Sequence, residues 1–373
     1  MRFYQLTITL FFVLNFSSMQ AQDRPRTYGI PFGDLPTGIN NAITDVPGVQ
    51  VGQITNIRGQ KIRTGITAIL AHQGNIFQQK VPAAIYLGNG FGKLMGYSQV
   101  EELGNLETPI VLTNTLSVPI AANGVIRYVL DQKGNEEVRS VNPLIGETND
   151  GRLNDIRSQP ITPKQVVQAI EAAQSGKVQE GNVGAGTGTV CFGWKGGIGT
   201  ASRKVGDYTL GVLVQTNFGG NLKIGGLDFS DLYRSYRQAQ EGKADKDGSC
   251  MIIVATDAPL LSRNLKRLAK RAILGLARAG GIASNGSGDY VIAFSNYQGN
   301  LVAYRSDEKE MSRQELRNSQ MTSLFQATID ATEEAIINSL FAAQTMKGNG
   351  YTVPQLPVDQ VIERLKEKQL LKK

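Results

Sequence analysis

Short, continuously apolar runs of strand-forming residues limit most strongly how this chain can fold. They recur along the sequence and are separated by turns rich in glycine or asparagine. Several contain no alternating polar residues, which is typical of strands covered on both faces. We expect strands at Gly65–Leu70, Ala83–Leu87, Ile110–Thr113, Thr189–Phe192, Thr209–Thr216, Met251–Thr256, Val291–Ser295 and Leu301–Tyr304.

Amphipathic helices are predicted between and after these strands. Thr162 and Pro163 indicate a helix start, because a side-chain cap followed by proline suits the first turn. Gly176 closes the apolar pattern that follows. Ser262 is expected to cap a second helix, which Gly280 ends.

The last predicted helical region begins after Ser312 and Glu315, which form a capping-box pattern. It covers 316–346, as one long helix or two, and ends before Gly348. Runs of strands followed by long, late helices favour a layered α+β fold over a doubly wound parallel sheet. A central pair of sheets covered by helices would bury both kinds of element.

Residues 1–21 have the pattern of a secretory signal peptide. Arg2 gives a basic start, Leu6–Phe16 is mostly apolar, and Ala21 is a small residue at a suitable cleavage point. The apolar run is shorter than the roughly 20 residues that span a bilayer. This length favours a signal peptide over the alternative, a membrane anchor. We therefore expect an exported protein, periplasmic or secreted, with residues 22–373 forming a single catalytic domain free of the membrane.

The chain contains one histidine, His72. This excludes a zinc site built from two or three histidines. A Ser-His-Asp triad would have to use His72, whose neighbours Ala71 and Gln73 give no sign of an orienting acid. A hydrolase with this sequence would therefore need another base, and we expect no metal and no organic cofactor.

Two glycine-rich segments, Gly88–Lys93 and Gly184–Gly188, lack the spacing of phosphate or dinucleotide motifs. We interpret them as tight turns packed close to a site. The net charge is +7, but the lysine and arginine residues are scattered among acidic residues and no nucleic-acid motif accompanies them. No nucleic-acid partner is therefore expected. Cys191 and Cys250 could pair in an exported protein or remain buried apolar residues.

Ser249 stands between a short charged loop, 241–248, and an apolar run that predicts a core strand. Its hydroxyl could attack the carbonyl of Gly248, and water could then cut the resulting ester. Glycine has no side chain to hinder that attack. The freed α-amine, with an ordinary pKa of roughly 7.7–8.0, could act as the base for the same serine.

A series of motifs in a fixed order extends over nearly the whole mature chain. They are Leu35–Gly38, Asn41–Val49, Gly88–Leu94, Leu112–Val118, Glu147–Asp150, Gly184–Gly188, Cys191–Gly193, Gly196–Ser202, Asp247–Ser249, Ala255–Leu260 and Gly286–Asp289. On these motifs the chain resembles the L-aminopeptidase/D-esterase family, which includes the bacterial β-peptidyl aminopeptidases.

The resemblance implies a four-layer αββα sandwich, similar to N-terminal-nucleophile hydrolases but connected differently. It also implies self-cleavage between Gly248 and Ser249 into chains 22–248 and 249–373, usually assembled as a homotetramer of processed heterodimers. Ser249 matches the nucleophile of the family. Asn217 matches the asparagine of the oxyanion hole, where a side-chain amide would stabilise the developing charge.

Further positions match less specifically. Ser287 and Asp289 match a serine and an acidic residue that lie beside the nucleophile and would orient its hydroxyl and hold its amine. The β-peptidyl members carry glutamate at the acidic position, so the shorter Asp289 favours an α-aminopeptidase. Glu147 is a candidate for binding the substrate's ammonium group, or a structural acid. Arg152 replaces an expected aromatic residue, and no role is assigned to it.

The resulting hypothesis is an exported serine aminopeptidase that acts on small peptides or on amino-acid amides and esters. It would use an acyl-enzyme on Ser249 and no cofactor. Three alternatives stay open: a β-peptidyl aminopeptidase, an acyltransferase of the ornithine acetyltransferase type, and a binding protein without activity. Acetyltransferases of that type use threonine as the nucleophile, which the serine argues against.

Overall fold

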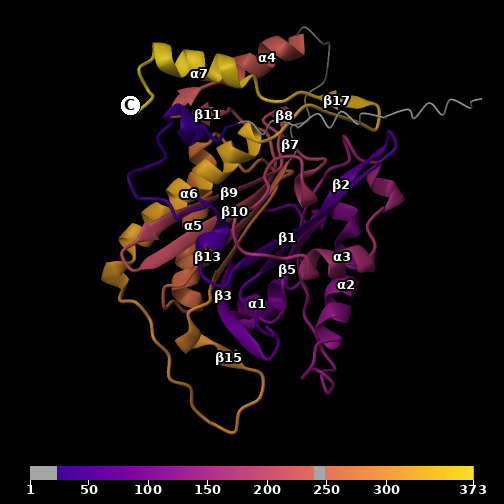
Figure 1. Cartoon of the computed structure of the whole chain (residues 1–373), viewed down its shortest axis with the longest axis vertical. Helices are drawn as coiled ribbons and strands as arrows, with labels where there is room; N and C mark the ends of the chain where they lie inside the picture. Colours follow the sequence, from indigo (N-terminus) through magenta and orange to yellow (C-terminus); the bar gives the residue numbers. More distant parts are fainter. Residues whose placement is uncertain (1–22, 239–247, 373) are drawn as a thin grey trace, which may run out of the picture.

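The computed structural model describes residues 23–238 and 248–372. Two β-sheets stacked face to face form the centre of this part of the chain (Figure 1). The first sheet is four-stranded, in the order β1-β2-β5-β6. Its strands are β1 (Gln50–Arg58), β2 (Ile62–Leu70), β5 (Ile110–Asn114) and β6 (Leu144–Thr148).

The second sheet follows the order β15-β3-β14-β13-β10-β9, with β4 paired to β3. β13 runs parallel to β14, and the other neighbours along this path are antiparallel. Parallel neighbours need a crossover, which helix α5 supplies between β13 and β14. The strands are β3 (Gln79–Gly90), β4 (Asn105–Leu106), β9 (Ile198–Val205), β10 (Tyr208–Asn217), β13 (Ser249–Thr256), β14 (Gly288–Ser295) and β15 (Val302–Ala303).

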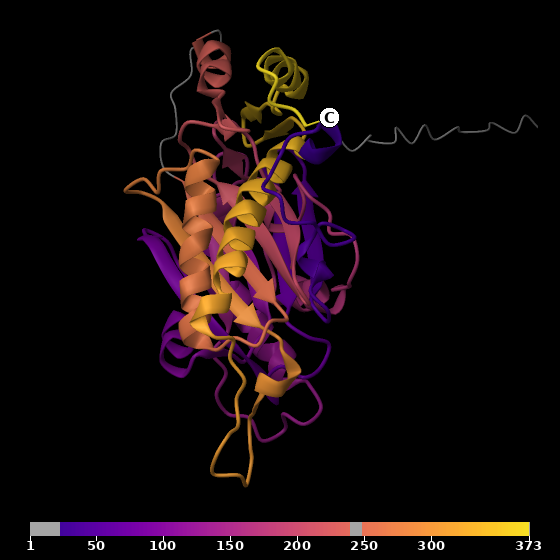
Figure 2. The same ribbon diagram turned by 90° about the vertical axis from the view of Figure 1, so that its left-hand side faces the viewer.

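Helices cover the outer face of each sheet and give the molecule four layers. α2 (Val118–Leu130) and α3 (Pro163–Glu171) pack on the first sheet. α5 (Ser262–Arg278) and α6 (Thr322–Phe341) lie side by side across the second (Figure 2). The predicted α+β class and its αββα layering are confirmed.

The layering explains why β13 is apolar along its length. Ile252 and Val254 belong to the apolar cluster under α5 and α6, whereas Met251 and Ile253 belong to the cluster between the two sheets. Successive side chains of a strand point to opposite faces, so a strand covered on both faces needs apolar residues throughout. Every residue of β13 is buried.

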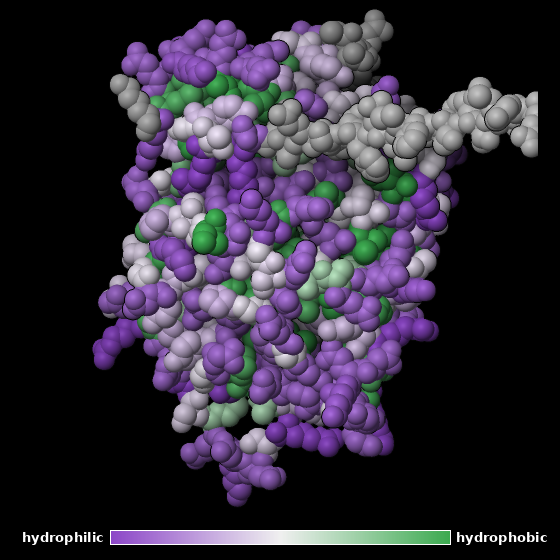
Figure 3. All heavy atoms as spheres, in the orientation of Figure 1, coloured by the Kyte–Doolittle hydropathy of each residue, from purple (hydrophilic) through white to green (hydrophobic). Residues whose placement is uncertain are grey.

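α4 (Ser230–Gln238) and α7 (Val358–Glu367) lie together at one end of the molecule (Figure 1). Arg364 of α7 donates two hydrogen bonds, of 2.8 and 2.9 Å, to the two carboxylate oxygens of Asp231 in α4. Hydrophobic residues gather directly beneath α7 in Figure 3.

In the described residues, no helix combines the length and the apolar character needed to cross a membrane. The remaining elements are α1 (Tyr97–Leu103), β7 (Val190–Cys191), β8 (Trp194–Lys195), β11 (Lys223–Ile224), β12 (Leu227–Asp228), β16 (Met346–Gly348) and β17 (Tyr351–Val353).

Two predicted helix starts are wrong. Ser262 is the first residue of α5 and not its cap; Leu261 holds the N-cap position without a side-chain hydrogen bond. Ser312 and Glu315 lie before α6 and do not cap it. Glu315 accepts a hydrogen bond of 2.8 Å from Asn264 instead, so a tertiary contact uses the carboxylate that the capping box would need.

Other predicted boundaries fare differently. The start at Thr162 is confirmed, since its side chain accepts from the backbone of Gln165, and Gly280 follows α5 in the left-handed region at φ 102°. The last long helix ends at Phe341, and Gly348 closes β16. The predicted run Thr189–Phe192 contains only the two-residue strand β7, and β1, β6 and β9 were not predicted.

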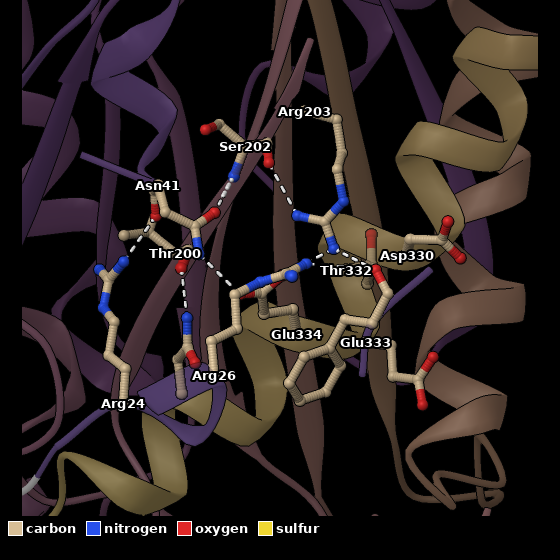
Figure 4. Close-up of polar contacts among 12 residues, drawn as sticks. Arg24, Arg26, Asn41, Thr200, Ser202, Arg203, Asp330, Thr332, Glu333 and Glu334 are labelled. Carbon is tan, nitrogen blue, oxygen red and sulfur yellow. Dashed lines mark hydrogen bonds and ion pairs between the residues drawn. The ribbon is translucent and has the colours of Figure 1, made fainter. Parts of the chain in front are cut away.

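A buried ionic network fastens the N-terminal segment to α6 (Figure 4). Arg26 donates to both carboxylate oxygens of Glu334, at 2.6 and 2.8 Å, and Arg203 of β9 reaches the same carboxylate at 2.6 Å. Asn41 adds a hydrogen bond of 2.6 Å. The side chains of Arg203 and Glu334 are fully buried. One carboxylate of α6 therefore binds the N-terminal segment and β9, both of which are distant from it in sequence.

Candidate active site

Ser249 begins β13 and lines a cavity of about 870 Å³. It is directly opposite Asn217, the last residue of β10, in the antiparallel pairing of the two strands. Both are nearly buried, with 7 % and 8 % of their surface exposed. The structure therefore brings the predicted nucleophile and the predicted oxyanion-hole amide to the same cavity wall, together with Gly248.

The backbone N–H of Gly288 lies next to the serine. It is within 3.2 Å of the Ser249 hydroxyl oxygen and also within 3.2 Å of the Gly248 carbonyl oxygen. The side chain of Asn217 is oriented from the other side, because its Oδ1 accepts a hydrogen bond of 3.0 Å from the N–H of Val190. The amide nitrogen is thus the end of Asn217 left for an oxyanion.

Ser287 and Asp289 flank Gly288 and are buried, but neither lines the cavity. Asp289 pairs with Cys250 across β13 and β14, one residue beyond Ser249. No hydrogen bond of ordinary geometry reaches its two carboxylate oxygens or the Ser287 hydroxyl among the described residues. Burial raises the pKa of Asp289 to about 6, and the nearby Ser287 hydroxyl and Cys250 N–H oppose that rise only in part.

Glu147, on β6 of the first sheet, lines the same cavity and is almost fully buried. One carboxylate oxygen accepts a hydrogen bond of 2.9 Å from the N–H of Lys93, and the other accepts from the Thr115 hydroxyl. Burial raises the pKa of Glu147, against the effect of these two bonds and of the Lys93 charge. A desolvated carboxylate in a cleft suits the binding of an ammonium group.

Several groups at the site were not found from the sequence. The Gly288 N–H is invisible to any argument from side-chain type. Thr115, Tyr233 and Arg234 line the cavity from segments distant in sequence. Asn89 lies in the glycine-rich segment Gly88–Lys93. Its amide donates to the Ser287 carbonyl and, at 3.0 Å, to the Ser284 carbonyl, so it fastens the turn that leads into β14.

His72 lies outside this cavity. Its Nε2 is 2.8 Å from the Gln79 carbonyl oxygen and its Nδ1 accepts from the N–H of Gly74, so the ring fastens a turn. Cys191 and Cys250 are both free and buried. No group of three or more His, Cys, Asp or Glu side chains is arranged to hold a metal in the described parts of the chain.

Comparison with known proteins decides the family. The model of peptidase family S58 matches residues 41–353, which contain all the site residues above. The chain is also 41% identical, over 360 residues, to the beta-peptidyl aminopeptidase BapA of Sphingosinicella microcystinivorans, covering 90% of this chain and 89% of that protein. The chain belongs to peptidase family S58.

Solved structures agree with this S58 assignment. The beta-aminopeptidase of a Burkholderia species superposes with a TM-score of 0.85 at 36% identity, covering 92% of this chain and 99% of that one. The L-aminopeptidase D-Ala-esterase/amidase of Ochrobactrum anthropi gives 0.84 at 34% identity, covering 94% and 99%. The latter is described as a variant of the Ntn hydrolase fold and a prototype of the serine aminopeptidases. The predicted resemblance is confirmed, and a general aminopeptidase activity is supported for this S58 member.

Proposed function

We propose that this S58 member is a serine aminopeptidase that cleaves its own Gly248–Ser249 bond and then uses Ser249 as the nucleophile. One observation carries the proposal. Ser249 begins a core strand at the wall of a cavity, with the Asn217 amide opposite and the Gly288 N–H at its hydroxyl. Two donors converging beside a serine form an oxyanion site without a metal or a histidine.

Self-cleavage would start with attack of the Ser249 hydroxyl on the Gly248 carbonyl carbon. The carbonyl oxygen becomes an oxyanion beside the Gly288 N–H, 3.2 Å away in the uncut chain. The bond between the Gly248 carbonyl carbon and the Ser249 nitrogen then breaks, and the nitrogen takes the proton that the hydroxyl has lost. This leaves an ester and the free α-amine of Ser249. Water cuts the ester and releases the Ser249 hydroxyl and the Gly248 carboxylate. A Cβ at Gly248 would lie 2.3 Å from Phe218 Cα and 2.5 Å from the Asn217 carbonyl oxygen, so only glycine fits here.

In substrate turnover, the freed amine takes the proton of its own hydroxyl while Ser249 attacks the substrate carbonyl. Asn217 and Gly288 stabilise the oxyanion, and Glu147 holds the substrate's ammonium group. The leaving group takes the proton from the Ser249 amine. Water then repeats the sequence on the acyl-enzyme and releases the N-terminal residue. Asp289, beside Cys250, would hold the protonated amine.

The proposed substrates are short peptides and amino-acid amides or esters. Similarity to a relative named beta-peptidyl aminopeptidase is an argument for substrates with an N-terminal β-amino acid. Asp289 in place of glutamate is an argument for α-amino acids. Rates for p-nitroanilides of L-alanine, D-alanine and β-alanine, measured side by side, decide between them. Acetyl transfer from N-acetylornithine, without anilide hydrolysis, would instead support the acyltransferase alternative.

Export and assembly are part of the proposal. Residues 1–21 lie outside the described residues, so their role as a signal peptide rests on the sequence. Loss of these residues from the mature protein in a periplasmic or culture fraction would support export. A mass equal to four processed heterodimers, measured by light scattering, would support the tetramer.

The deciding experiment is denaturing electrophoresis of the purified protein. We expect two chains, and the smaller should begin Ser-Cys-Met-Ile at Ser249. Ser249→Ala should give one uncut chain without activity, while Ser262→Ala, at the start of α5, should be cut normally. A single intact wild-type chain would overturn the proposal. Cleavage of the Ser249→Ala chain would assign the cut to another protease.

A further inference from the structure

The cavity beside Ser249 carries more positive than negative side chains. The charged residues of the described chain that line it are Glu147, Lys93, Arg152, Arg234 and Arg237. Four cations therefore surround a site with one carboxylate. An ammonium-binding site needs only that carboxylate, so the cations call for a second, anionic part of the substrate.

The cations and the carboxylate are distributed along the cavity on either side of the nucleophile. Glu147 binds the N–H of Lys93, and the loop at Gly92 packs against Gly288 beside Ser249. On the other side, Asn217 accepts from Val190, which begins the β7–β8 hairpin. This hairpin meets α4, because the Trp194 ring packs on the Tyr233 ring with centroids 5.3 Å apart.

A substrate that places its ammonium at Glu147 and its carbonyl at Ser249 would thus direct its leaving group toward α4. Arg234 and Arg237 of α4 line the cavity there. Arg152 also lines it, with its guanidinium 5.9 Å from the centre of the Tyr351 ring. The α4 side of the cavity is therefore cationic.

Two of these cations are in no ion pair among the described residues. Among the described residues, no carboxylate lies within 4.0 Å of the side-chain nitrogens of Arg152 or Arg234. Arg364, at the neighbouring surface, is by contrast matched by Asp231. Guanidinium groups bind carboxylates in a bidentate manner, and the attraction increases where the groups are partly removed from water.

We propose that Arg152 and Arg234 form a carboxylate-binding subsite for the leaving group, which makes short peptides with a carboxylate one residue beyond the scissile bond the favoured substrates. The inference rests on the proposed function. The carboxylate is either the C-terminus of a dipeptide or the side chain of an acidic second residue. A cavity of about 870 Å³ lies within the usual range for small-molecule sites.

The test compares matched substrates that differ in one charge. The first pair is X-Ala and X-Ala-amide, where X is the N-terminal residue preferred among the anilides. The second pair is X-Asp-amide and X-Asn-amide. We expect kcat/KM to be about tenfold higher for the charged member of at least one pair, as one charge-assisted contact provides. The pair that discriminates identifies the source of the carboxylate.

Variants assign the effect to the subsite. Arg234→Gln and Arg152→Gln should each reduce the preference toward one, mainly through a higher KM for the charged member of the pair. Arg234→Lys should restore part of it. Arg127→Gln removes a charge from α2, outside the cavity, and should leave the preference unchanged.

The outcomes separate this inference from the proposed function. Anilide hydrolysis without any preference for charged leaving groups overturns the carboxylate subsite and leaves the aminopeptidase intact. A preference that survives both glutamine variants also overturns it. Failure to hydrolyse any substrate, with a folded and cleaved chain, overturns the proposed function itself.

Discussion

At the scale of single residues, two buried carboxylates at the candidate site differ in their surroundings. Glu147 lines the cavity and is hydrogen-bonded by Lys93 and Thr115, whereas Asp289 does not line it and has no ordinary hydrogen bond among the described residues. Burial raises the pKa of both. Their charge states therefore follow from their surroundings, which sequence alone does not give.

Glu147 gives a pH-dependent binding prediction. Only its ionised form attracts an ammonium group, so KM should rise as the pH falls through its pKa, which burial places above the ordinary 4.5. Glu147→Gln should raise KM about tenfold or more at neutral pH and abolish this acid limb, because the lost contact involves a charge. KM measured from pH 5 to 8 for the two proteins checks it. An unchanged acid limb in the variant would exclude Glu147 as the ammonium site.

Asp289 gives a stability prediction for the uncut chain. Its folded pKa of about 6 exceeds the ordinary 3.8, so the folded state binds the proton more tightly than the unfolded state. The contribution of Asp289 to the free energy of unfolding is therefore fully present at low pH. It falls by roughly 2–3 kcal/mol as the pH rises from about 4 to about 6.

The measurement uses urea unfolding of Ser249→Ala and of Ser249→Ala/Asp289→Asn at pH 4 and pH 8. The second variant lacks the ionising group, so its stability relative to the first should increase by the same amount between the two pH values. A difference that does not change with pH would contradict the buried, unpaired carboxylate.

At the scale of elements, the sequence predicted those strands whose two faces are both apolar. β2, β3, β5, β10, β13 and β14 were found in this way. β9 was missed because it carries Thr200, Ser202 and Arg203, whose buried polar groups are matched by partners from elsewhere. Thr200 accepts from the N–H of Ile43, and Ser202 accepts from that of Gly38. A polar strand of this kind is stabilised by a tertiary partner, and no local pattern records that partner.

The site was predictable to a similar extent. Ser249 was indicated by its position before a core strand, and Asn217 by resemblance to a family. The Gly288 N–H depends on the parallel register of β13 with β14. Arg234 depends on the position of α4, a helix without buried residues. Register and the docking of peripheral helices are long-range properties.

The packing of β9 on α6 is tight enough to test. A Cβ on Gly199 would lie 1.9 Å from the Ala335 carbonyl oxygen in α6, so Gly199→Ala should force the two elements apart and cost about 3 kcal/mol. Gly206, in the turn after β9, has a φ of 58° and no atom within 4 Å of the position a Cβ would take. Gly206→Asn should be nearly neutral, because asparagine tolerates that conformation. Urea midpoints compare the two, and equal midpoints would contradict the close contact.

At the scale of the whole molecule, the buried network of Figure 4 crosses the proposed cut. Arg26 and Arg203 would fall on the large chain and Glu334 on the small chain. β13 and β14 would also belong to the small chain, and they lie between β10 and β3 of the large chain. The proposed cleavage would therefore leave the sheet and its ionic network intact.

Glu334 provides the corresponding prediction. Glu334→Gln would leave Arg203 buried without its charge partner, so the variant should lose about 3–5 kcal/mol of stability. Glu333→Gln is the matched control, because Glu333 lies 3.7 Å from a partly exposed Arg278 and should lose less than about 1 kcal/mol. Denaturant unfolding of the purified proteins checks both values. A small loss in Glu334→Gln would mean that water reaches the network.

The interior position of β13 and β14 also bears on whether the protein can recover from denaturation. The uncut chain carries the connection between β12 and β13, which brings these strands into the sheet within one molecule. Once that connection is cut, two separate polypeptides must find each other, and each exposes apolar strand edges that favour aggregation. We therefore expect the uncut Ser249→Ala protein to refold after dilution from urea, and the processed protein to unfold irreversibly. Maturation of this kind would remove a covalent connection that the chain needs in order to fold, so the native state would be kept only by its slow unfolding.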